Sequence, residues 1–72
     1  MMIEDPRAYV QMALDITRQI ESGKIKQGDR APSITEMSKR YNHARLTCAK
    51  SLKMLESRGL LYKIPGKGYY VK

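Results

Sequence analysis

Basic side chains recur along one side of a predicted helix in the second half of the chain. At about 100° per residue, Leu46, Lys50, Lys53 and Ser57 fall within about 60° of one another. This face holds two cations and no acid, and Arg45 stands at the start of the helix. A row of cations suits a polyanion, and an arginine can hold a guanine or a phosphate through two hydrogen bonds.

Residues that serve catalysis or metal binding are scarce by comparison. The chain has one histidine, His43, and one cysteine, Cys48, which falls in an apolar row where a buried thiol is expected. A structural zinc site needs four such ligands. No nucleophile stands beside a base, no carboxylates are paired, and Gly66-Lys67-Gly68 is too short for a phosphate-binding loop. We therefore predict no enzyme, no metal and no cofactor.

Charge is divided unequally along the 72 residues, whose net charge is +7. Residues 1–36 hold five cations and six acids, whereas residues 37–72 hold nine cations and one acid, Glu56. A strongly basic half suits a polyanionic partner, although a solvated basic surface would have the same composition. A chain of this length forms one small domain, expected over residues 1–72.

The sequence shows no mark of export or membrane insertion. No apolar run approaches the roughly 18 residues of a membrane span, and residues 1–5 lack signal-peptide character. A single cysteine excludes an internal disulfide and suits a reducing compartment. We expect a cytoplasmic protein.

The first element that must position the basic face is a helix over about 6–22. Asp5 is a suitable N-cap, Pro6 suits the first helical position, and Gly23 ends the helix. Its predicted buried stripe is Tyr9, Met12, Ala13, Ile16 and Ile20. Val10 and Leu14 lie beside the stripe, where they either widen the core face or pair two subunits in a homodimer.

Two further helices are predicted over about 33–41 and 45–58, with Ser33 as the cap of the first. Only Asn42 and His43 lie between the first helix and the opening of the second near Ala44–Arg45, and Asn42 tolerates the positive φ that so tight a turn needs. Ser38 and Cys48 are small enough for a close crossing. Cys48 also begins the predicted core row of the second helix, which continues with Leu52 and Leu55. This pattern is typical of a helix-turn-helix.

The chain ends in two predicted strands that form a hairpin over about 60–72. Residues 65–68 join the strands, and their two glycines permit a tight turn. Leu60 and Tyr70 are expected to face the helices, leaving Tyr62 and Tyr69 either to stack on bases or to pack on the hairpin. Three helices and a terminal hairpin make a winged helix-turn-helix, mainly α with a small β-hairpin.

In helix-turn-helix proteins the second helix enters the major groove, and its first residues reach base edges. Arg45 is the candidate for a guanine or a phosphate. Leu46 could touch a thymine methyl or be an ordinary exposed leucine. Thr47 could bond to phosphate, base or its own helix, and Lys50 and Lys53 are expected at phosphates. At the hairpin tip, a lysine between glycines suits the adjacent minor groove.

Four stretches together resemble the DNA-binding domain of the GntR family of bacterial transcription regulators. They are residues 28–33 (GDRAPS), 41–52, 58–60 and 65–71 (PGKGYYV), and the resemblance covers about 9–71. It implies DNA contacts from the starts of both helices of the pair and from the hairpin, or wing. The predicted contact residues are Ser33, Thr35, Arg45, Leu46, Thr47, Lys50, Lys53, Gly66, Lys67 and Gly68.

The sequence departs from the family pattern at three positions. The family often has arginine where this chain has Thr35 and Ala49, and serine or threonine where it has Ala44. Ala44 is a poor N-cap, so the helix start lacks a side-chain hydroxyl for phosphate. These losses shift the expected weight of binding to Lys50, Lys53 and Lys67, and the operator is expected to differ from the commonest family pattern.

The resemblance implies a sequence-specific binder of double-stranded DNA that regulates transcription as a repressor. Family members usually carry a C-terminal effector or dimerisation domain, so this chain is either part of a longer protein or a stand-alone regulator, with no effector site of its own evident. The alternative is an assembly module whose basic face meets an acidic protein. The lysines of that face argue against it, because interaction surfaces are depleted of lysine.

Overall fold

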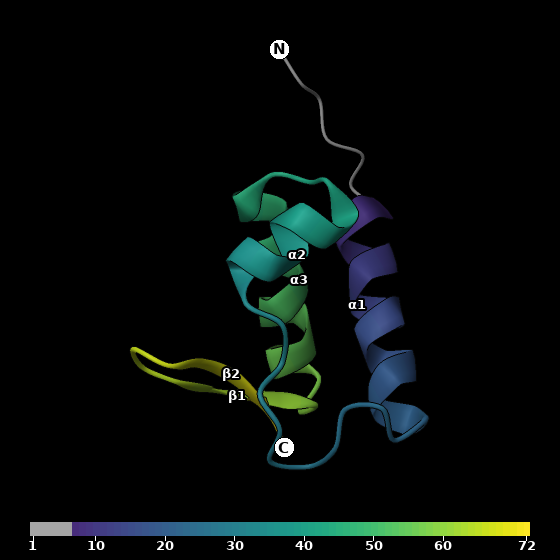
Figure 1. Ribbon diagram of the computed structural model, residues 1–72, viewed down its shortest axis with the longest axis vertical. Coiled ribbons are helices and arrows are strands. Elements are labelled where there is room, and N and C mark those ends of the chain that lie inside the picture. Colours follow the sequence, from purple (N-terminus) through teal and green to yellow (C-terminus); the bar gives the residue numbers. More distant parts are fainter. Residues whose placement is uncertain (1–6) are drawn as a thin grey trace.

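The structure is a computed structural model that describes residues 7–72 (Figure 1). Its elements in chain order are α1 (Arg7–Glu21), α2 (Ile34–Tyr41), α3 (Arg45–Ser57), β1 (Leu61–Ile64) and β2 (Gly68–Val71). The strands form one antiparallel hairpin, which projects from the helical body on the side away from α1 (Figure 1). The predicted fold class, three helices followed by a wing, is confirmed.

α1 packs mainly against α3 through the stripe that its sequence predicts. The middle of the stripe is fully buried, and Tyr9 and Ile20 pack at its two ends. The buried residues are Met12, Ala13 and Ile16. The predicted cap at Asp5 and Pro6 lies outside the described residues.

Val10 and Leu14 lie on α1 beside this stripe. Val10 is half-buried and Leu14 is 36% exposed, and neither packs against the core cluster. The interpretation that they widen the core face therefore does not hold. Pairing of two copies through this face stays a prediction.

The turn between α2 and α3 has the backbone that its asparagine predicts. Asn42 has φ 55° and ψ 47°, in the left-handed region that asparagine tolerates better than most residues. Ser38 Oγ donates a 2.8 Å hydrogen bond to the carbonyl oxygen of His43, which ties α2 to the chain just before α3. Cys48 is fully buried one turn into α3. The two small residues thus allow the close crossing that defines a helix-turn-helix.

α2 begins with a reciprocal pair of hydrogen bonds. The Ser33 hydroxyl accepts from the Glu36 backbone N–H at 3.0 Å, and the Glu36 carboxylate accepts from the Ser33 backbone N–H at 3.1 Å. Hydrogen bonds from the Ser33 backbone N–H and then from its hydroxyl lower the pKa of the Glu36 carboxyl. This capping box fixes where α2 starts.

Ser33→Ala is expected to lower the free energy of unfolding by about 1 kcal/mol, because the substitution removes the side-chain cap. Since the folded pKa of Glu36 is lowered, its part of the stabilisation is present at neutral pH and is lost as pH falls through that pKa. Urea unfolding measures both effects. Ser57→Ala is the control, because that exposed hydroxyl bonds only at the far end of α3. Equal midpoints for the parent and Ser33→Ala would contradict the assigned cap.

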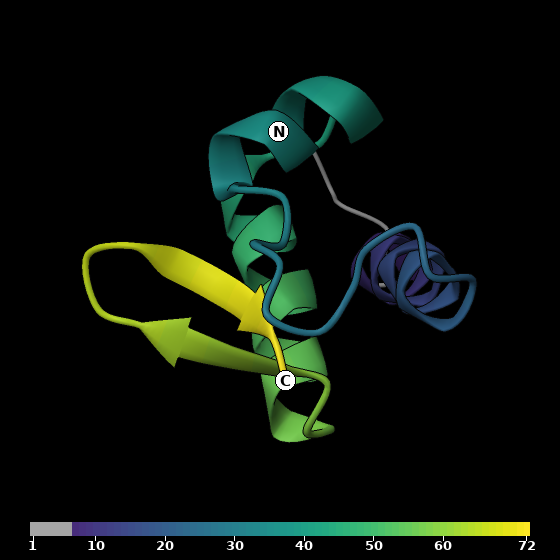
Figure 2. The same ribbon diagram turned by 60° about the horizontal axis from the view of Figure 1, so that its bottom comes forward.

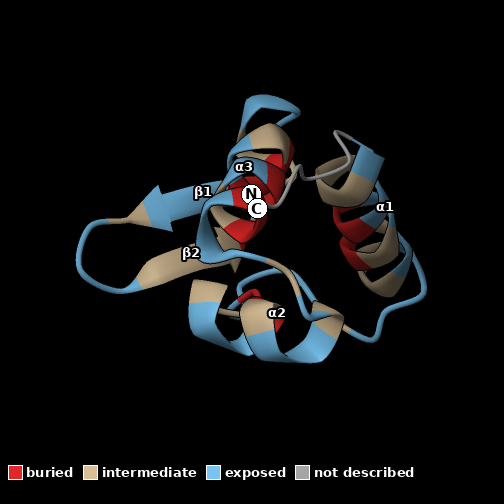
Figure 3. Cartoon of the chain, turned by 90° about the horizontal axis from the view of Figure 1, so that it is seen from above, coloured by how far each residue is buried: buried red, intermediate tan, exposed pale blue. Residues whose placement is uncertain are grey.

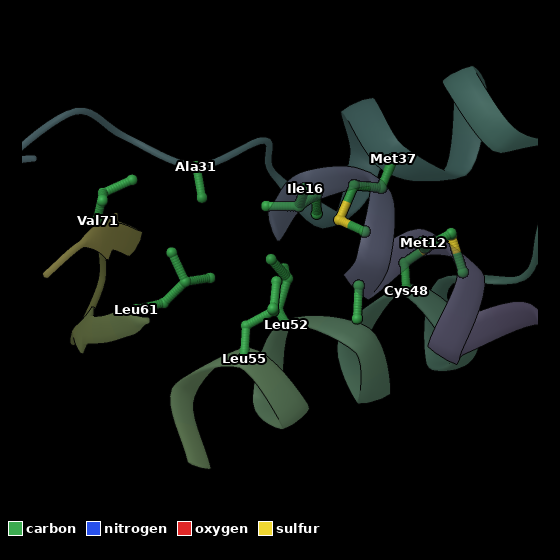
Figure 4. Close-up of a cluster of buried hydrophobic side chains, with 10 residues drawn as sticks. Met12, Ile16, Ala31, Met37, Cys48, Leu52, Leu55, Leu61 and Val71 are labelled. Atoms are coloured by element: carbon green, nitrogen blue, oxygen red, sulfur yellow. The ribbon is translucent and has the colours of Figure 1, made fainter. Parts of the chain in front are cut away.

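The core draws on every element and on the segment that precedes α2 (Figure 4). Cys48, Leu52 and Leu55 of α3 are at most 1% exposed, as the predicted core row requires. Ala31 enters from the connecting segment. The buried residues of α1 and α3 lie on the sides that face each other (Figure 3).

β2 is held on both edges. It pairs with β1 in the register Leu61↔Val71, Tyr62↔Tyr70, Lys63↔Tyr69 and Ile64↔Gly68. On its other edge the Ala31 N–H donates to the carbonyl of Tyr69, and the Val71 N–H donates to the carbonyl of Asp29, both at 2.9 Å. Residues 28–31 therefore run beside β2 and anchor the wing to the helical body (Figure 2).

The predicted inner face of the hairpin is wrong by one residue. Leu61 and Val71 are the buried pair, whereas Tyr70 lies on the other face with Tyr62. The rings of Tyr62 and Tyr70 stack there with centroids 6.0 Å apart. Leu60 does pack at the edge of the core, but from the turn before β1. A shift of one residue moves every side chain of a strand to the opposite face.

Candidate nucleic-acid interface

The outward side of α3 is the basic face that the sequence predicts. Leu46, Lys50, Lys53 and Ser57 are all exposed, and Leu46 is 69% exposed. The single acid of α3, Glu56, lies off this face by about 60° or more at 100° per residue. The face is therefore uniformly cationic or neutral.

The start of α3 is joined to the start of α2 by one side-chain hydrogen bond. Arg45, the first residue of α3, donates from Nη1 to Thr35 Oγ1 at 2.8 Å. Ala44 occupies the N-cap position with extended backbone and offers no side-chain cap, as predicted. Two predicted contact residues, ten positions apart in sequence, thus lie side by side.

A groove of about 360 Å³ lies between the starts of α2 and α3 and the hairpin. Four cations line it, namely Arg30, Arg45, Lys53 and Lys63, and no acid does. Lys53 belongs both to this groove and to the outward face of α3. The two surfaces are therefore one continuous cationic strip, which we call the basic strip.

The tip of the wing is a tight turn. The Lys67 N–H donates to the Ile64 carbonyl at 2.9 Å, with Pro65 and Gly66 between them. Gly66 has φ 78°, so proline followed by a glycine of positive φ has the pattern of a type II turn. Lys67 is exposed beyond the helical body, and Gly68 beside it has φ 104°. The tip therefore presents one lysine and bare backbone.

Arg30 and Lys63 are additions to the predicted set. The backbone of Arg30 forms an isolated antiparallel β-bridge with Tyr70. The Arg30 side chain lies near Gly68, with its Nε 3.9 Å from the position that a Cβ on Gly68 would take. Lys63 reaches the groove because it pairs with Tyr69 on the inner face of the hairpin. Both placements depend on strand pairing between distant segments. The sequence signal was limited to the position of Arg30 in the GDRAPS stretch, just before the cap of α2.

Thr47 and Tyr69 both direct their side chains toward the core. Thr47 is 3% exposed on the inner side of α3, so its side chain is not available to a base edge. Tyr69 packs against the core, and burial, followed by the Glu56 carboxylate, raises the pKa of its phenol. We therefore keep neither side chain in the proposed contact set. Ser33 uses its hydroxyl in the cap of α2.

Within residues 7–72, no three His, Cys, Asp or Glu side chains gather closely enough to hold a metal ion. Over the same residues, no helix combines the length and the apolar character that crossing a membrane requires.

The chain matches the model of a known protein family over most of its length. The family model described as bacterial regulatory proteins, gntR family, matches residues 8–71. The chain belongs to the GntR family. The match spans all three helices and the hairpin, so both halves of the basic strip lie inside it.

Curated GntR relatives are transcription regulators. The chain is 36% identical over 63 residues to the uncharacterized HTH-type transcriptional regulator YcxD of Bacillus subtilis, covering 88% of this chain and 14% of that protein. It is 35% identical over 63 residues to the arabinose metabolism transcriptional repressor of Geobacillus stearothermophilus, covering 88% and 17%. The chain thus spans less than a fifth of the length of either relative.

A solved GntR-type structure has the same fold. It is the AraR DNA-binding domain in complex with operator ORR3, with a TM-score of 0.86 and 30% identity. The superposition covers 100% of this chain and 83% of that one. The family match and the solved structure therefore both indicate the fold of a DNA-binding regulator domain. Neither the Bacillus relative nor the Geobacillus relative is named as an enzyme.

Proposed function

We propose that this chain binds double-stranded DNA in a sequence-specific manner and regulates transcription, with α3 in the major groove. The observation that carries the proposal is the basic strip, an exposed cationic surface without an acid that joins α3 to the wing. DNA presents about one negative charge per 1.7 Å of its axis, so such a strip matches it in sign along its whole length.

The dimensions of α3 fit this role. A helix with side chains is about 10–12 Å across, and the major groove is about 12 Å wide. In this docking mode the first residues of the helix reach base edges, which gives base contacts to Arg45 and Leu46. Arg45 can pair with guanine, and the exposed Leu46 can contact a thymine methyl. Lys50 and Lys53, further along the same face, then meet phosphates.

The groove and the wing extend the same footprint. Arg30 and Lys63 line the groove between α2 and the hairpin, where a phosphate backbone flanking the major groove would run. The wing tip then lies over the adjacent minor groove, and Lys67 follows its negative potential. Gly66 and Gly68 lack side chains and so let the backbone approach DNA closely.

We propose that regulation takes the form of repression in the bacterial cytoplasm. The Geobacillus relative is named a transcriptional repressor, and the AraR domain of similar fold is bound to an operator. A repressor needs only to occupy its operator, which a DNA-binding strip of this kind can do.

Selection of bound duplexes from a random pool tests the proposal. We expect a short motif to be enriched over successive rounds, because base contacts from Arg45 and Leu46 discriminate between sequences. A pool that stays random while still binding would reduce the function to unspecific attraction. A pool that does not bind at all would refute the proposal.

Lys67→Ala is expected to weaken binding to the selected duplex by roughly 1 kcal/mol and to reduce the salt slope by about one, because one phosphate or minor-groove contact is lost. The thermal midpoint should not change, since Lys67 is exposed. Gly68→Val should instead lower stability as well, because Gly68 has φ 104°. Parental affinity of Lys67→Ala at several salt concentrations would remove the wing tip from the interface.

A further inference from the structure

We infer that Thr35 is a positioning residue, which holds the Arg45 guanidinium for base recognition rather than making its own essential DNA contact. The inference rests on the proposed function and deepens it. The observation behind it is the 2.8 Å hydrogen bond from Arg45 Nη1 to Thr35 Oγ1, which crosses from α3 to α2.

Thr35 is well suited to act as a fixed acceptor. It is the second residue of α2, and the Ser33–Glu36 capping box on either side of it sets the helix start. Threonine is branched at Cβ, so its χ1 angle has two main alternatives in a helix. Its hydroxyl oxygen therefore has few possible places relative to the helical body, and in the structure it accepts from Arg45 Nη1.

Arg45 is the residue that gains from this acceptor. It is exposed at the first position of α3, where a long side chain samples many rotamers unless something holds it. Arginine has five N–H donors in a planar fork. With one Nη1 hydrogen on Thr35, the edge formed by Nε and Nη2 remains available for the two acceptors of guanine, O6 and N7.

The ordering takes place before DNA arrives. Immobilising a side chain rich in rotamers on binding costs free energy, and a hydrogen bond within the free protein removes part of that cost. The gain applies to a contact that needs one orientation of the guanidinium. Binding to phosphates of any duplex tolerates many orientations and gains little, so Thr35 is expected to affect specificity more than general affinity.

The test is a double-mutant cycle on the duplex selected from the random pool, with a scrambled duplex beside it. Thr35→Val keeps the shape of the side chain and removes the hydroxyl, whereas Thr35→Ser retains the hydroxyl. Each is measured in the parent and in an Arg45→Ala background. We expect Thr35→Val to weaken binding to the selected duplex about three- to tenfold. This is the effect expected when the Arg45 side chain is no longer held before binding.

Thr35→Val should weaken binding to the scrambled duplex less than twofold. Thr35→Ser should retain most of the affinity for the selected duplex. In the Arg45→Ala background Thr35→Val should have no further effect, because the residue it positions is gone. Thermal midpoints should match throughout, since both side chains are exposed. This combination of results would support the inference.

Two outcomes would overturn the inference while leaving DNA binding intact. An equal loss from Thr35→Val in both backgrounds would mean that Thr35 contacts DNA by itself. Unchanged specific affinity for Thr35→Val in the parent would mean that the hydrogen bond has no part in recognition. A parent that prefers no duplex refutes the proposed function instead, and that failure is recognised because it appears without any substitution.

Discussion

Raising the salt concentration from roughly 50 to 200 mM is expected to weaken duplex binding by this chain about a thousandfold. About six basic groups against DNA would give a slope near −5 for log K against log salt, since each cation that approaches the duplex displaces condensed counterions. Five of them, Arg30, Lys50, Lys53, Lys63 and Lys67, are placed for phosphates or the minor groove, and Arg45 adds its charge in the major groove. Fluorescence anisotropy of a labelled duplex over this range measures the slope directly.

A matched control is available on the opposite side of the molecule. Arg18 is exposed on α1, about 180° around that helix from its buried stripe, so its charge faces away from α3. Arg18→Ala should leave the slope unchanged, whereas Lys53→Ala and Lys63→Ala should each reduce it by about one. A flat salt response of the parent would rule out the phosphate contacts, and with them the role of the basic strip.

Arg45→Ala is expected to lose roughly 1–3 kcal/mol of binding free energy on the selected duplex and much less on a scrambled one. The expectation follows from the place of Arg45 at the start of α3. It also follows from the Nε–Nη2 edge of its guanidinium, which the hydrogen bond to Thr35 leaves available. A bidentate contact with a base discriminates between sequences, whereas a contact with phosphate does not. Titrating both duplexes at one salt concentration gives the specificity ratio, which should fall several-fold or more.

Lys53→Ala is the counterpart to this variant. Lys53 lies eight residues further along α3, about 80° around the helix from Arg45, and is expected at phosphate, so its removal should weaken binding to both duplexes about equally. Both substitutions remove one exposed cation from α3, and they differ only in the contact proposed. Equal losses on both duplexes for Arg45→Ala would show that Arg45 is only a phosphate clamp.

The helix pair could be predicted from the sequence because its determinants are local. Asparagine is one of the few residue types that tolerate positive φ, so the turn at Asn42 can be predicted from that residue alone. The spacing of Cys48, Leu52 and Leu55 follows the helical period. Once the buried side of α3 is known, the exposed side follows from geometry. The outward position of Leu46 can therefore be predicted from the sequence, and the structure confirms it.

The orientation of the wing strands is harder to predict, because their sequence does not show which residues face the core. Apolar residues occupy 60, 61 and 62 in succession, so alternation does not indicate which of them faces the core. The phase is set by pairing with residues 28–31, where Asp29 and Ala31 bond to the edge of β2. That pairing between distant segments also brings Arg30 and Lys63 to the groove, so their place there cannot be predicted from the local sequence.

Thr47 illustrates a different difficulty. It stands two residues from the exposed Arg45, and at about 100° per residue this places it well around the helix toward the core. Its residue type suits both a phosphate contact and a half-buried helix position, so type alone did not decide between them. The packing of α3 against the rest of the molecule decides it, since only 3% of Thr47 remains exposed.

We propose that α3 reads the major groove through Arg45, and methylation interference is the measurement that bears on this claim. Guanine N7 lies in the major groove and is one of the two acceptors that an arginine fork occupies. Methylating the selected duplex at N7 is predicted to block binding by the parent at one or more guanines, and Arg45→Ala should become indifferent to at least one of them. If no guanine interferes with the parent, or if the same guanines interfere with Arg45→Ala, the claim is contradicted.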